Sequence, residues 1–341
     1  MNFGWRRQAV CLGGCLLAWF LVCGGPNAGG SSLWGAEPDR IGYTPQRLVT
    51  GPPDEPAWIP QPLITAVGTI ERLDQDRLTL RPVDGGERLD LAADQLLWVD
   101  PGWDDPDALA GMAAYRSGDY AEAIPPLLAA LKRRPPLWRQ QWLSVRMAIA
   151  ACEAGRYPAA LELTAQLDRI GLPAVMVGQL PFAWQRPVRD PRRGAAARAK
   201  LAAKEPLVQL MAASYLLAGS EGAAADATLA RLSQAGERPL VARMADALRW
   251  RRSPPARTSE RAPRWQEKLG RLPIAVRWGP MMVIAERWQA AAEPERALQW
   301  WLAAGLLAPQ RGHPAARRAQ QQAADLLQQL ERSPERLPEI E

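Results

Sequence analysis

The sequence contains a single histidine, His313, and four cysteines, of which only Cys152 lies beyond the first 23 residues. A zinc site made of cysteine and histidine needs three or four such ligands close together, so composition nearly excludes that class of metal site. A catalytic triad would have to use His313, which lies in the Gly- and Pro-containing segment 310–314. We interpret it as an exposed loop histidine. The sequence therefore predicts no metal, no cofactor and no catalytic residue.

Lysine is also scarce, since only four of the 42 basic residues are lysines. The 36 acidic residues are interspersed among the basic ones and leave a net charge of +6, which argues against a nucleic-acid-binding protein. One basic cluster stands out: Arg186, Arg189, Arg192, Arg193, Arg198, Lys200 and Lys204. Because no aromatic residues alternate with these cations, we interpret the cluster as a solvated segment. Binding of a polyanion or a glycan is the alternative.

Charge is absent from residues 8–36, which follow the pair Arg6 and Arg7. A basic start followed by a short apolar stretch and small residues is typical of a secretory signal peptide. The pattern predicts export to the periplasm or cell envelope. A retained anchor in the inner membrane, with N-terminal membrane contact, is the alternative. After cleavage Cys152 has no cysteine left to pair with, so the fold must be stable without a disulfide.

Residues 37–62 contain seven of the 32 prolines, which predicts an extended linker without a helix or a central strand. Residues 63–101 alternate between apolar and polar side chains, with turn residues at 74–76 and 84–86. This pattern predicts a small antiparallel β meander of three or four strands. We interpret it as a docking or spacer module.

Residues 102–173 change to helical periodicity. Two helices meet at a corner around Gly118 and end at Pro135, and the same order repeats around Gly155 and ends at Pro173. Pro125 and Pro126 fall inside the second helix of the first unit and predict a kink there.

This pattern resembles the tetratricopeptide repeat, a helical hairpin in which small residues allow the two helices to approach closely. The likeness is carried by Ala110, Gly111, Gly118, Asp119, Tyr120, Ala123, Ala130 and Pro135 in the first unit, and by Ala148, Gly155, Arg156, Tyr157 and Ala160 in the second. A third match lies at Ala285, Trp288, Ala297, Trp301, Ala304 and Pro309, with Ala292 and Pro294 in place of the corner glycine and tyrosine. The order of segments is also similar to exported repeat proteins of unknown role in planctomycete-type bacteria.

The expected fold is mainly α, with tetratricopeptide-like hairpins forming an α-solenoid after the β meander and the signal segment. The remaining expected segments are a Pro/Arg-rich linker at 174–205, degenerate helical repeats at 206–252, a linker at 253–263, a C-terminal repeat with a capping helix at 264–331, and a tail at 332–341.

The resemblance implies a non-enzymatic scaffold or adaptor that binds another envelope protein or a peptide. In this family the first helices of the hairpins line the concave, partner-binding face. The residues placed there are Met112, Tyr115, Arg116, Trp142, Val145, Ile149 and Cys152. The alternative is that the β module or the segment after Pro173 covers the same side chains. An accessory subunit of an enzyme is a further alternative function.

Overall fold

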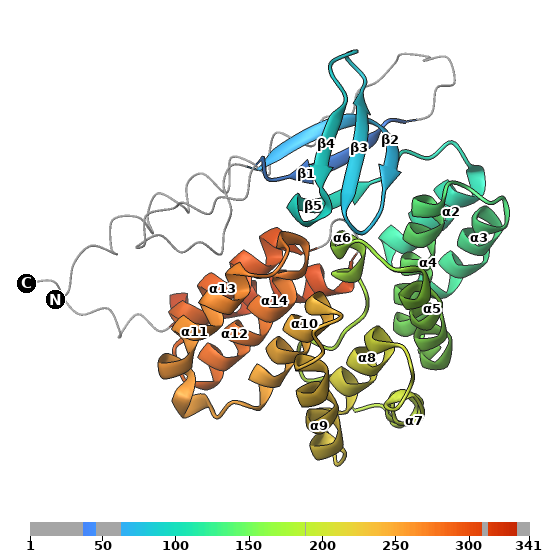
Figure 1. The fold of residues 1–341 in the computed structure, drawn as a ribbon. Coiled ribbons are helices and arrows are strands. Elements are labelled where there is room, and N and C mark those ends of the chain that lie inside the picture. The colour runs from blue at the N-terminus through green and yellow to red at the C-terminus, as the bar shows by residue number, and fades with distance from the viewer. Residues whose placement is uncertain (1–36, 46–62, 188, 309–312, 333–341) are drawn as a thin grey trace, which may run out of the picture. The chain divides into compact units, whose positions relative to one another are not determined.

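The computed structural model describes residues 37–45, 63–187, 189–308 and 313–332. The expected signal segment, most of the expected proline-rich linker and nearly all of the expected tail lie outside these residues. Within them the chain is mostly helical, with one small antiparallel sheet near its start (Figure 1). This confirms the mainly helical class and a small antiparallel sheet, although the sheet has five strands rather than the three or four of the predicted meander. Across the described residues, no helix is both long and apolar enough to cross a membrane.

The sheet has five antiparallel strands in the order β4-β3-β2-β1-β5. They are β1 (Asp39–Tyr43), β2 (Ile64–Leu73), β3 (Arg77–Pro82), β4 (Leu89–Ala92) and β5 (Leu96–Asp100). The prediction of an extended linker over 37–62 is wrong at its start, because β1 lies between β2 and β5. Pro38 and Pro45 flank a proline-free run that is long enough for one strand.

A buried carboxylate joins this sheet to the helices. Asp39 in β1 accepts hydrogen bonds from the backbone N–H groups of Ile70 in β2, at 2.8 Å, and Gly102, at 2.9 Å. It also pairs with Arg139 at 2.8 Å, and the Arg139 guanidinium lies over the rings of Trp103 and Trp138. The contact fixes the end of β5 against the helical region.

The first two helical hairpins form where the sequence predicts them. They consist of α2 (Pro106–Ser117) with α3 (Tyr120–Lys132), and α4 (Leu137–Glu153) with α5 (Tyr157–Ile170). Gly118 and Gly155 have positive φ values of 92° and 74° at the two corners, a conformation that glycine adopts without strain. Helix α3 is continuous through Pro125 and Pro126.

Close packing within the first hairpin depends on small residues. A Cβ atom added at Gly111 in α2 would lie 2.7 Å from Leu127 Cγ in α3, closer than carbon atoms approach without a clash. Ala123 in α3 is fully buried, whereas Ala121, two residues earlier, is exposed. The expected assignment of Gly111 and Ala123 to the helix contact is consistent with this geometry.

The middle of the chain is more ordered than its proline content predicts. Residues 174–205, expected as a linker, contain α6 (Ala174–Val177) and α7 (Pro191–Lys200). The side chains of α6, together with Phe182 and Trp184, are buried in the main core, which explains why this segment follows a fixed path. The degenerate repeat region contains α8 (Pro206–Leu216), α9 (Gly222–Ser233) and α10 (Pro239–Arg249).

The expected linker at 253–263 also contains helix, because α11 (Thr258–Gly270) begins there and includes Pro263. The C-terminal region then forms a hairpin of α12 (Trp278–Ala290) and α13 (Pro294–Leu307), followed by α14 (Pro314–Arg332). The start of α14 returns to the first hairpins, where Arg317 hydrogen-bonds the hydroxyl group of Tyr120 and Arg318 pairs with Glu153 at 3.7 Å.

Candidate functional site

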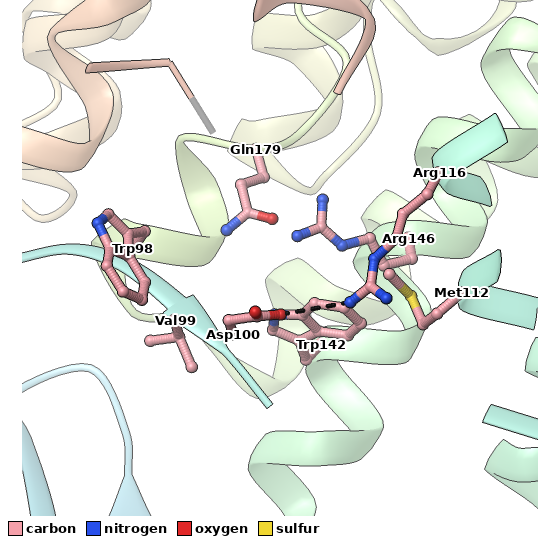
Figure 2. A pocket seen from close by; sticks show the side chains of 8 residues that line it. All are labelled: Trp98, Val99, Asp100, Met112, Arg116, Trp142, Arg146 and Gln179. Atoms are coloured by element: carbon pink, nitrogen blue, oxygen red, sulfur yellow. Dashed lines mark ion pairs between the residues drawn. The ribbon is translucent and has the colours of Figure 1, made fainter. Parts of the chain in front are cut away.

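A small pocket lies where β5, α2, α4 and the segment after α6 meet. Its lining residues are Trp98, Val99, Asp100, Met112, Arg116, Trp142, Arg146 and Gln179. The cavity volume is about 20 Å³, which accommodates one water molecule or one small ion. Figure 2 shows the side chains of Arg116 and Arg146 entering it from the helical side, with Gln179 and β5 facing them.

Arg146 is the most unusual residue of the pocket, because it is a cation that is only 5% exposed. Its guanidinium carbon lies 4.3 Å from the ring centroid of Trp142 and 5.1 Å from that of Tyr115. Its Nη1 donates a long hydrogen bond of 3.4 Å to the Tyr115 hydroxyl. No carboxylate of the described residues forms an ion pair with it, so the aromatic rings carry most of its stabilisation.

The pocket also contains buried polar atoms without partners. Within the described residues, the Nε atom of Arg146, the Nε1 atom of Trp142 and the Oε1 atom of Gln179 have no hydrogen-bond partner. Each unsatisfied buried polar atom costs about 1 to 3 kcal/mol. Three such atoms around one pocket indicate a site whose polar groups are not fully used by the protein itself.

The second cation of the pocket, Arg116, is half-exposed and pairs with Asp100 at a distance of 3.6 Å. That ion pair is long and partly solvated, so it contributes little to stability. The lining therefore contains two cations and one anion. Its net charge of +1 favours an anion over a cation or a neutral group.

The structure buries most of the expected partner-binding face. Met112, Tyr115, Trp142, Val145, Ile149 and Cys152 are at most 6% exposed, and only Arg116 is accessible. Strand β5 and Gln179 line the same pocket as Met112 and Trp142, so the β module and the segment after Pro173 cover this part of the face. Cys152 is covered by α8 instead, since its Sγ lies 3.3 Å from the hydroxyl group of Tyr215. This arrangement corresponds to the alternative drawn from the sequence, in which those side chains belong to the core.

His313 is buried, and the prediction of an exposed loop histidine is wrong. It is 2% exposed, its Nε2 lies 3.1 Å from the carbonyl oxygen of Gln179, and its Nδ1 accepts the N–H of Ala315. Its ring also packs edge-on against Trp278. Burial lowers the pKa of His313 to about 3, so the imidazole is neutral at physiological pH. A neutral imidazole with both nitrogens engaged has a structural role.

Three of the seven residues of the basic cluster are engaged within the protein. Arg198 pairs with Glu221, Lys200 pairs with Glu162, and Arg193 lies over the rings of Tyr157 and Tyr215. These contacts reduce the free positive charge on α7, although Arg192 on this helix and Arg186, Arg189 and Lys204 outside it remain exposed. None of these exposed cations lines the pocket found in the described part of the chain, so the cluster is less favoured as a site than the pocket beside α2 and α4.

The pocket residues Arg146, Gln179 and Asp100 were not predicted from the sequence. One signal was present for Arg146, which is a lone charge among the apolar residues Leu143, Val145 and Met147 of one helix. A helical segment that is apolar on all sides is expected to be buried, and a charge within it is buried with it. Gln179 and Asp100 come from other elements, and no spacing along the sequence joins them to α4.

The composition of this pocket favours an anion as its ligand. Its polar groups are two guanidinium groups, an indole, an amide and one carboxylate, with no nucleophile among them. Over the part of the chain that the structure describes, no group of three or more histidine, cysteine, aspartate or glutamate side chains is placed to hold a metal ion. No protein-family model, curated protein or solved structure shows significant similarity to the chain.

Proposed function

We propose that this chain is a non-enzymatic interaction protein of the cell envelope, whose helical hairpins bind another envelope protein or a peptide. The proposal rests on the resemblance of its hairpins to tetratricopeptide repeats and on the signal-like first 36 residues. The single observation that supports it best is the Arg116 side chain, which stays accessible on the first hairpin where a partner can reach it.

The partner would contact the rim of this pocket rather than the buried face. Arg116 is the accessible member of the expected set, with a side chain that is 46% exposed. Leu109, on the same helix, is 47% exposed and adds an apolar contact. Because the two residues are two helical turns apart on α2, about 10 Å, they suit a partner that presents a carboxylate and an apolar side chain at that separation.

Two experiments test this function. Fractionation with intact-mass measurement determines whether the protein resides in the envelope and whether residues 1–36 are removed, and a cytosolic full-length species would contradict the proposed location. Affinity capture from the envelope fraction, repeated over a range of bait concentrations, is expected to enrich one partner in a saturable way. Capture that rises linearly with bait would argue against a specific interaction.

A further inference from the structure

The pocket around Arg146 contains an unbalanced positive charge. Arg146 is only 5% exposed, and none of the described carboxylates forms an ion pair with it. Removing an arginine from water without a counter-ion is costly, and cation–π contacts return only part of that cost. A bound anion would supply the missing counter-charge.

The size and composition of the cavity restrict which anion fits. A volume of about 20 Å³ suits a species of about the size of a water molecule or a chloride ion. The net lining charge of +1 matches a single negative charge. Trp142 and Met112 add an apolar wall, and weakly hydrated monovalent anions tolerate such surroundings better than multivalent ones do.

We propose that this pocket binds a chloride-sized monovalent anion, held by the guanidinium groups of Arg146 and Arg116 beside the indole of Trp142. Asp100 keeps Arg116 at the edge of the pocket through their 3.6 Å ion pair, so the anion lies nearer to Arg146. The ion joins α2 and α4 at the point where both meet β5. This proposal does not depend on the partner-binding function.

The test uses chloride itself as the probe. In ³⁵Cl NMR, a chloride ion that exchanges with a protein site produces excess line broadening. We expect the wild-type protein to broaden the signal in a saturable way, and Arg146→Gln to reduce the excess at least fivefold. The matched control is Arg192→Gln, which removes an exposed arginine of α7 and is expected to leave the broadening unchanged. Arg116→Gln is expected to reduce it by a smaller factor.

Three results would overturn the proposal. One is no saturable broadening with the wild-type protein, and another is equal broadening with folded Arg146→Gln. The third is that acetate displaces chloride at a lower concentration than bromide does. That result would mean that the pocket binds a carboxylate group rather than a halide-sized anion. If Arg146→Gln does not fold, the test uses Arg116→Gln and the bromide and acetate titrations of the wild-type protein instead. Unchanged chloride broadening with Arg116→Gln then refutes the proposed site.

Discussion

Replacing Asp39 with asparagine tests how the sheet is attached to the helices. The carboxylate is 1% exposed and accepts two backbone N–H groups as well as Arg139. Asparagine has the same shape but carries no charge. Its amide NH₂ group is a donor, and it would face the backbone N–H groups and the Arg139 guanidinium, which are donors too. At least one donor then loses its acceptor, and Arg139 loses its counter-ion.

The magnitude follows from the burial of the two partners. Breaking a buried ion pair by removing one partner costs about 3 to 5 kcal/mol. The lower end applies to Asp39→Asn, because the Arg139 side chain is 18% exposed and water replaces part of the lost interaction. We expect a loss of about 3 kcal/mol. With a urea m-value of about 3 kcal/mol per molar, the unfolding midpoint falls by about 1 M.

Urea unfolding followed by tryptophan fluorescence measures this effect. Asp104→Asn is the matched control, because Asp104 is exposed near the same chain segment, and we expect its midpoint to shift by less than about 0.2 M. If Asp39→Asn unfolds at the wild-type midpoint, the carboxylate does not hold β1 and α4 together, and the attachment described above is wrong.

Three further predictions concern packing, backbone strain and pH. Ala123→Leu is expected to destabilise the first hairpin by about 1 to 3 kcal/mol through overpacking, whereas Ala121→Leu at an exposed position changes little; equal melting temperatures would refute the packing. Ala292 has a positive φ of 60°, a strained conformation for alanine, so Ala292→Gly is expected to stabilise the protein by about 1 kcal/mol. Ala291→Gly is the control and is expected to destabilise it. Thermal melting measures both effects, and a lower melting temperature for Ala292→Gly together with a higher one for Ala291→Gly would contradict the positive φ at Ala292. Because burial lowers the pKa of His313 to about 3, the unfolded chain takes up its proton first, near pH 6.5. The contribution of His313 to the free energy of unfolding is therefore fully present above that pH and falls as the pH drops toward 3. We expect the NMR signal of this single imidazole in the folded protein to stay constant from pH 8 to 4.5. A titration midpoint of that signal above pH 5 would disprove the prediction.

The helical hairpins could be predicted because their signals are local. Gly118 and Gly155 mark the corners, and the small residues Gly111 and Ala123 recur at the helix contact. Helical periodicity and a left-handed corner depend on residues a few positions apart, so one sequence is enough to find them. The same holds for α14 (Pro314–Arg332), which lies at the end of the segment where a capping helix is expected.

Features that depend on distant partners could not be predicted. Strand β1 is short and lies between prolines, and it becomes a central strand only because β2 and β5 are available on both sides. His313 is buried because Trp278 and Gln179 surround it, and neither is near it in the sequence. The core role of Tyr115 follows equally from the neighbouring elements that pack against it. For such residues, helical spacing defines the face of a helix but not what covers that face.

The central claim is that the protein binds a partner at the hairpin surface beside Arg116. The most direct measurement compares the dissociation constant of the captured partner for the wild-type protein, Arg116→Ala and Arg192→Ala. Both arginines are exposed, so both variants are expected to melt within a few degrees of the wild type. We expect at least a tenfold weaker complex for Arg116→Ala and an unchanged one for Arg192→Ala. Equal affinity for all three proteins, or no saturable partner, would contradict it.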